Sequence, residues 1–176
     1  AVSRRDRSRA GLPEHEDLEF VQGDVGRQAD LLRMLRGVHT PIYLVHSMEG
    51  GIGEADAFVA RDKLAAKAFA KAAAKAGVDR NLYVSGLQPD APVSKHLTSR
   101  QDVERYLGYM GVPVTVLRAG FIIGPNSAGF QMLRGLIRHL PTLLIPPRMY
   151  HETQPAYVDD VLEAMVRCLE HPKETS

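Results

Sequence analysis

The stretch that decides the fold runs from residue 81 to residue 107 and reads NLYVSGLQPDAPVSKHLTSRQDVERYL. Its first residues are apolar and typical of a short β-strand at 82–84, and a polar, proline-bearing loop separates them from a helical pattern. His96 and Arg100 are four residues apart and therefore share one face of that helix. Ser85 follows the strand, at the end where ligands bind in open α/β sheets. We therefore expect three polar side chains to converge here.

The chain on either side of this stretch alternates between strand-like and helix-like segments. The expected strands are the first few residues, 18–21, 42–45, 82–84, 114–117 and 143–145. The expected helices are 27–35, 55–76, the segment around 96–107, one with the apolar stripe Phe130, Leu133, Ile137 and Leu140, and 158–169. Alternation of this kind predicts parallel βαβ units in one α/β domain that covers residues 1–176.

The composition excludes several kinds of partner. The chain has 176 residues, 44% of them apolar, and a net charge of +1, so neither nucleic acid nor an anionic membrane is expected to bind it. No apolar run approaches the roughly 20 residues that cross a bilayer. The single cysteine, Cys168, is expected to be buried and inert, and it favours a reducing, cytoplasmic location.

The familiar catalytic and metal-binding motifs are missing from the sequence. The seven histidines form no HxxxH or HExxH pattern, so no metal site is expected. There is no GxSxG motif of the kind that α/β-hydrolases carry. Gly50, Gly51 and Gly53 follow a strand, but their spacing fits neither common phosphate-binding loop, which favours a flexible connection.

Arginines near the start of the chain, Arg4 and Arg5 among them, admit two interpretations. They can be an exposed basic terminus without a specific role. They can also be a cluster that binds phosphate, because guanidinium groups contact phosphate oxygens in pairs.

Five segments together resemble the short-chain dehydrogenase/reductase superfamily, in its extended or atypical branch of NAD(P)-binding, epimerase/dehydratase-like and NmrA-like proteins. They are VQGDV at 21–25, YLVHSM at 43–48, YVSGL at 83–87, VTVLRAGFIIGP at 114–125 and QPAYVDDVLEAM at 154–165. Each segment is weak evidence alone, but all five occur in the family's order. The resemblance implies a Rossmann-like parallel sheet with flanking helices.

The resemblance also implies roles for individual residues. Ser85 corresponds to the catalytic serine, and the cofactor side would be formed by Arg4, Arg5, Asp24, Val25, His46, Ser47 and Arg118. A small-molecule substrate would lie against Phe121, Ile122 and Phe130. Basic residues at the end of the second strand accept the 2′-phosphate of NADP, so Arg4 and Arg5 favour NADP(H) over NAD(H).

The chain departs from the family in two ways. His96 and Arg100 stand where the family has Tyr and Lys, so a degenerate His-x-x-x-Arg replaces Tyr-x-x-x-Lys as the catalytic pair. The family's first strand and Gly-rich turn are also absent, so the sequence looks N-terminally truncated. Since that turn holds the pyrophosphate, we expect the chain to bind a dinucleotide poorly or not at all. A homodimer, in which a second copy closes the sheet, is one way to compensate.

Three hypotheses for function stay open at this point. The chain can be an oxidoreductase- or epimerase-like enzyme that uses NADP(H) on a small carbonyl or sugar-type substrate, with His96 or a water held by Ser85 as proton donor. It can be a dinucleotide-binding module without turnover, of the redox-sensing or complex-accessory kind. It can also be an inactive fragment of either.

Overall fold

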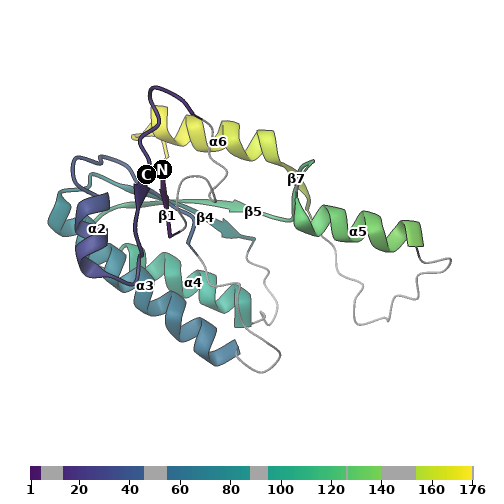
Figure 1. Ribbon diagram of the computed structural model, residues 1–176, viewed down its shortest axis with the longest axis horizontal. Helices are drawn as coiled ribbons and strands as arrows, with labels where there is room; N and C mark the ends of the chain where they lie inside the picture. Colours follow the sequence, from purple (N-terminus) through teal and green to yellow (C-terminus); the bar gives the residue numbers. More distant parts are fainter. Residues whose placement is uncertain (5–13, 46–54, 88–94, 126, 140–153, 176) are drawn as a thin grey trace.

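The computed structural model describes residues 1–4, 14–45, 55–87, 95–125, 127–139 and 154–175, and strands and helices alternate along them (Figure 1). The strands are β1 Val2–Ser3, β2 Val21–Gln22, β3 Ile42–Tyr43, β4 Asn81–Gly86, β5 Val114–Ala119, β6 Ile122–Ile123 and β7 Ala156–Tyr157. The helices are α2 Gln28–Met34, α3 Ala55–Ala76, α4 Lys95–Leu107, α5 Ala128–His139 and α6 Val158–Glu170.

Every strand pair in the described residues is parallel, which confirms the expected α/β class. β3, β4 and β5 form a three-stranded sheet in that order, while β1 pairs with β2 and β6 pairs with β7. No backbone ladder joins β1 to β3 among these strands. In a sheet of order 3-2-1-4-5-6, a further strand would lie at that junction.

The main core lies between the three-stranded sheet and helices α3 and α4, which cover the same face (Figure 1). Alanines make the close packing possible, since Ala66 and Ala73 are completely buried on α3. Val103 and Leu107 of α4 are buried beside them, which confirms the stripe expected for that helix. Gly77 ends α3 with φ +72°, a conformation that favours glycine.

The opposite face of the sheet is covered by α6 (Figure 1), which is tied to the start of β4 by Arg80. Arg80 is 5% exposed and donates hydrogen bonds to the carbonyl oxygens of Cys168 (2.6 Å) and Pro172 (3.4 Å). It also donates to the hydroxyls of Thr175 (3.0 Å) and Thr115 (3.3 Å). Cys168 is buried, as the sequence predicted.

Some expected elements differ in the structure. The strand expected at 18–21 is β2 at Val21–Gln22, and β6 and β7 were not expected at all. The strand expected at 143–145 lies outside the described residues. The apolar stripe expected on α5 is partly exposed in the described residues, since Leu133 is 44% exposed and Ile137 63% exposed. The helix extends away from the sheet beyond β7 (Figure 1).

Membrane crossing finds no support in the described helices, because none of them is both long enough and apolar enough to span a bilayer.

Candidate functional site

The candidate catalytic serine lies at the carboxyl end of β4. Ser85 is 3% exposed, and its Oγ makes no hydrogen bond within the part of the chain that the structure describes. An unpaired buried hydroxyl costs roughly 1–3 kcal/mol, so it calls for an explanation beyond packing. Ser85 is paired in register with Arg118 of β5, and parallel strands place such partners on the same face of the sheet.

Helix α4 brings Arg100 over this end of β4. A Cβ atom added to Gly86 would lie 3.7 Å from Cδ of Arg100 and 3.2 Å from Cδ2 of Leu97. The glycine therefore allows the helix to lie close to the strand end. His96 is on the first turn of the same helix, one turn before Arg100, as the spacing predicts. Its side chain lies outside the described residues.

Tyr83 is a buried residue of the strand that carries Ser85, and it is not among the predicted site residues. Tyr83 is two residues before Ser85 on β4, so both side chains are on the same face. Burial raises the pKa of the Tyr83 hydroxyl, while the positive charge of Arg100 and the Ser85 hydroxyl oppose that rise. Tyr83 and Ser85 thus lie on one face of β4, and the Ser85 Oγ makes no hydrogen bond there among the described residues.

A buried carboxylate lies behind Tyr83. Asp62 of α3 is 4% exposed and accepts a hydrogen bond of 3.5 Å from the Ser99 hydroxyl of α4. Its charge raises the pKa of Tyr43 and of Tyr83, in both cases after the larger effect of burial. The sequence carries a signal for this: Asp62 falls at helical spacing with Phe69 and other buried positions of α3.

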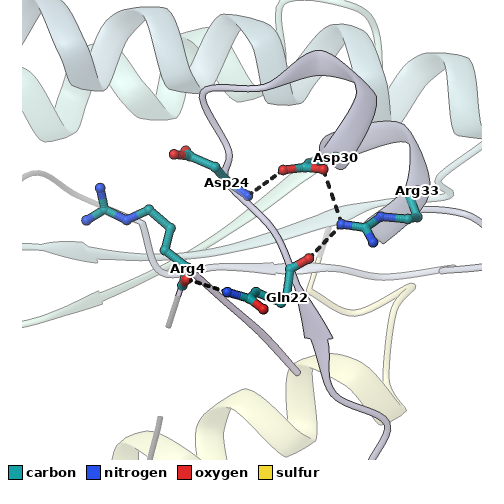
Figure 2. A network of polar contacts seen from close by, with 5 residues as sticks. All are labelled: Arg4, Gln22, Asp24, Asp30 and Arg33. Carbon is teal, nitrogen blue, oxygen red and sulfur yellow. Dashed lines mark hydrogen bonds and ion pairs between the residues drawn. The ribbon is translucent and has the colours of Figure 1, made fainter. Parts of the chain in front are cut away.

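The other candidate cofactor residues lie at the carboxyl ends of β1 and β2. Figure 2 shows the Arg4 side chain and the Asp24 carboxylate extending to the same side of these strands. The backbone carbonyl of Arg4 accepts a hydrogen bond from Gln22 Nε2 at 3.1 Å. Asp24 Oδ1 accepts from the Gly26 amide at 2.8 Å, which fixes the turn through Val25.

A second set of contacts supports this end of the sheet from the opposite side (Figure 2). Arg33 of α2 donates to the Gln22 carbonyl at 2.6 Å and to Asp30 at 3.1 Å. The other oxygen of Asp30 accepts from the Asp24 amide at 3.0 Å. The strand end that carries Asp24 is therefore held in place by α2.

The other residues predicted to contact cofactor or substrate do not gather at one place. Arg118 donates to Glu104 of α4 at 2.6 Å, so its guanidinium joins β5 to α4. Phe121 is 38% exposed, Ile122 lies in β6, and Phe130 is half-buried in the first turn of α5. Arg5, His46 and Ser47 lie outside the described residues.

A cavity of about 330 Å³ adjoins the carboxyl ends of β4 and β5 on the α6 side, and its lining differs from the predicted one. It is lined by Leu87, Arg118, Gly120, Ala156 and Asp160, among others, but not by Phe121, Ile122 or Phe130. A Cβ atom at Gly120 would collide with the Gln154 carbonyl, so glycine is required there. Mostly apolar walls with one carboxylate suit a small organic molecule.

Metal chemistry has no visible basis in the described part of the chain, where no group of three or more His, Cys, Asp or Glu side chains could hold an ion.

Comparison with known families gives a match over most of the chain. A family model described as NAD(P)H-binding matches residues 1–134. No curated protein matches the chain.

Solved structures of similar fold include WbmH of Bordetella bronchiseptica in complex with NAD+, at 17% identity and a TM-score of 0.74, over 96% of this chain and 62% of that one. The dTDP-glucose 4,6-dehydratase DesIV of Streptomyces venezuelae is 20% identical, with a TM-score of 0.73 over 91% and 57%. The UDP-N-acetylglucosamine 4-epimerase of Bacillus cereus is 16% identical, with a TM-score of 0.72 over 96% and 62%. The chain thus spans about three-fifths of their length.

Proposed function

The chain belongs to the NAD(P)H-binding family, and from that premise we propose that it binds NADP(H) across the carboxyl ends of its parallel strands. We further propose that it acts as an oxidoreductase- or epimerase-like protein on a small carbonyl or sugar-type substrate. The observation that carries the proposal is the buried Oγ of Ser85, which has no hydrogen-bond partner within the described part of the chain and lies at a strand end that Arg100 overlies.

The residues present suit the two ends of a nicotinamide dinucleotide. At β1 and β2 the Arg4 and Asp24 side chains extend to the same side (Figure 2), where the guanidinium suits a phosphate and the carboxylate suits the amino group of the adenine. At β4 there are a cation, Arg100, and the Ser85 hydroxyl, which has no hydrogen-bond partner in the described residues; both suit the ribose and carboxamide of the nicotinamide half. Ligands bind beyond the carboxyl ends of strands in sheets of this kind.

The preference for NADP(H) rests on Arg4 and on Arg5 beside it. A guanidinium at the end of the second family strand offers paired donors to a 2′-phosphate. Asp24 contributes less to this choice, since one carboxylate oxygen is already used by the Gly26 amide. We therefore expect Arg4 to discriminate between the two coenzymes and Asp24 to bind both alike.

The chemistry is divided between the cofactor and the chain. When bound, the dinucleotide supplies or accepts a hydride. We propose that Arg100 holds ribose or phosphate oxygens, because its guanidinium stays charged and does not transfer protons. His96 is proposed as the proton donor, since an imidazole exchanges protons near neutral pH. The sugar-nucleotide enzymes among the solved neighbours favour a sugar-type substrate.

The test is NADPH consumption by the purified chain with a panel of aldehydes, ketones and nucleotide sugars. His96→Ala is expected to lower the rate at least about tenfold, the usual size of a general-acid contribution. His139→Ala is a matched control, because that histidine is on α5, where its Nδ1 lies 2.8 Å from the Gly135 carbonyl. If His96→Ala turns over as fast as the wild type, His96 is not the proton donor.

A second candidate function is a dinucleotide-binding module without turnover. It is favoured by the burial of Ser85, which leaves only 3% of the residue exposed, and by the absence of the family's Tyr and Lys. This alternative predicts saturable NADPH binding with no consumption across the whole panel. Steady consumption with any substrate would exclude it.

A further inference from the structure

The cavity of about 330 Å³ beside α6 takes no part in the proposed function. One of its walls is the end of β5 with the residue after it, and another is the first half of α6. The β5 wall is formed by Leu117, Ala119 and Gly120, and the α6 wall by Val161 and Ala164. We call this space the α6 cavity.

The α6 cavity lies on the face of the sheet that α6 covers, opposite the face covered by α3 and α4 (Figure 1). Leu117 lines it, whereas the next residue, Arg118, is paired in register with Ser85, and successive side chains of a strand point to opposite faces. Thr115, on the same face as Leu117, donates its hydroxyl to the Thr175 carbonyl after α6 at 2.9 Å. The sheet therefore separates this cavity from Ser85.

The walls of the α6 cavity are mostly aliphatic, and several of the side chains are no larger than alanine. A Cβ atom at Gly120 would collide with the Gln154 carbonyl, so the end of β5 and the residues before β7 are in direct contact. That contact fixes the shape of one wall. An apolar space of this size takes a small organic molecule.

The α6 cavity has one carboxylate that the described residues leave unpaired. Asp160 is in the first turn of α6, and its carboxylate makes no hydrogen bond or ion pair in the described part of the chain. Arg118 also lines the cavity, but its guanidinium donates to Glu104 of α4 at 2.6 Å, on the other face of the sheet. The cavity therefore attracts a cation and repels an anion.

We propose that the α6 cavity binds a small apolar primary amine, with its hydrocarbon part between β5 and α6 and its ammonium group at Asp160. Burial of the hydrocarbon supplies most of the affinity, and the charge pair supplies the selectivity. Phosphate-bearing molecules are excluded, because the one cation among the described lining residues is engaged by Glu104. The site is separate from the proposed cofactor site, since the two lie on opposite faces of the sheet.

Three probes of similar size and different charge test this proposal: cyclohexylamine, cyclohexanol and cyclohexanecarboxylate. Each is titrated without NADPH into the ¹⁵N-labelled chain, so the result is independent of the proposed function. We expect cyclohexylamine to shift the amide signals of Ala119, Gly120 and Ala164 in NMR spectra, with a dissociation constant of about 1–10 mM. The carboxylate should bind at least about threefold more weakly than the amine. No saturable shift of these amides with the amine, or equal affinity for the carboxylate, would overturn the proposal.

Asp160→Asn tests the charge pair, and Asp159→Asn is its matched control. Both variants replace an exposed carboxylate in the first turn of α6, but only Asp160 lines the cavity. Asp160→Asn is expected to weaken cyclohexylamine about threefold to fivefold, the value of an exposed charge pair, and to leave cyclohexanol unchanged. Asp159→Asn should leave the affinity for both probes unchanged. Equal effects of the two variants would show a general attraction by the start of the helix and would overturn the assignment to Asp160.

Ala164→Leu tests where the hydrocarbon lies, because the larger side chain would occupy the α6 wall of the cavity. It should weaken cyclohexylamine and cyclohexanol alike, each at least about fivefold, since the space for the ring is lost. Thermal unfolding shows whether the variant keeps its fold. Unchanged affinity in folded Ala164→Leu would overturn the proposal. If that variant does not fold, the comparison of Asp160→Asn with Asp159→Asn decides alone.

Discussion

The two ends of strand β4 differ in how their buried polar groups are satisfied. At the amino end, Arg80 is 5% exposed and donates to four oxygens from β5, α6 and the residues after it. At the carboxyl end, Ser85 is just as buried and its Oγ has no partner among the described residues. The amino end keeps one exception, the Oδ1 atom of Asn81, whose Nδ2 donates to Leu107.

The difference suggests that stability and function are divided along one strand. A buried guanidinium that donates to four oxygens fixes α6 and the C-terminal residues to the sheet. A buried hydroxyl without a partner costs stability, and that cost is understandable if a ligand provides the partner. Substitutions at the amino end should therefore affect unfolding, and those at the carboxyl end should affect binding.

The largest effect is expected at the amino end. Arg80→Met removes the hydrogen bonds that a buried charged donor makes to four oxygens, so it should lower the free energy of unfolding by about 3 kcal/mol. Urea unfolding measures the change. Arg105→Met is the control, because that arginine is exposed and pairs with Asp102, three residues away, which is worth less than about 1 kcal/mol. Similar losses in both variants would contradict the special role of Arg80.

Substitutions at the carboxyl end of β4 should instead weaken cofactor binding and leave the free energy of unfolding largely unchanged. Arg100→Met is expected to weaken NADPH and NADH alike, each by about tenfold, because the charge-assisted hydrogen bonds to the nicotinamide half are lost. Ser85→Ala should also weaken binding, but its unfolding free energy should stay unchanged or rise, since an unpaired hydroxyl is removed. Titration and urea unfolding test these variants in parallel. A clear loss of stability in Ser85→Ala would show that the serine is structural.

A smaller and more selective effect is expected at β1. Arg4→Ala should weaken NADPH about fivefold and leave NADH unchanged, because only NADPH carries the 2′-phosphate. Arg33→Ala is the control, since its guanidinium is occupied by the Gln22 carbonyl and Asp30. Any effect of that variant should be equal for the two coenzymes. Equal loss of NADPH and NADH affinity in Arg4→Ala would show that the arginine does not bind the 2′-phosphate.

The smallest expected effect is a loss of stability at alkaline pH. Burial raises the pKa of Tyr43 above its ordinary value of about 10, and Asp62 adds to the rise. Folding thus favours the neutral form of the Tyr43 hydroxyl. Its contribution to the free energy of unfolding is complete below about pH 10 and is lost as the pH rises beyond that value. At about pH 10.5 the wild type should lose up to about 1 kcal/mol more stability than Tyr43→Phe. Identical pH profiles of the two proteins would contradict this.

The arrangement around β4 could be predicted from local sequence signals. The alanine-rich pattern gave α3 its bounds, and Gly77 ends that helix at a positive φ. The four-residue spacing of His96 and Arg100 places both on α4, and the apolar stripe that follows them is buried as expected. These features depend on neighbours within one or two helical turns, which periodicity records directly.

The buried polar contacts behind β4 could not be predicted with the same ease. Tyr43, Asp62, Tyr83 and Ser99 come from β3, α3, β4 and α4, and their proximity depends on how two helices cross one sheet. The position of Asp62 on the apolar face of α3 is a signal, but it does not reveal which hydroxyls surround the carboxylate. Likewise, the stripe on α5 predicted amphipathicity but not whether a partner covers Leu133 and Ile137. Burial depends on tertiary contacts that a pattern does not contain.

The central claim, that the carboxyl end of β4 forms part of a dinucleotide site, is tested most directly by calorimetric titration of NADPH into three proteins. These are the wild type, Arg100→Met and Arg80→Met, the last at a temperature where it remains folded. The wild-type dissociation constant is expected to be below about 1 mM, or −4.1 kcal/mol. The account predicts saturable binding by the wild type and by Arg80→Met, and about tenfold weaker binding by Arg100→Met. No saturable binding by the wild type, or equal affinity in Arg100→Met, would contradict it.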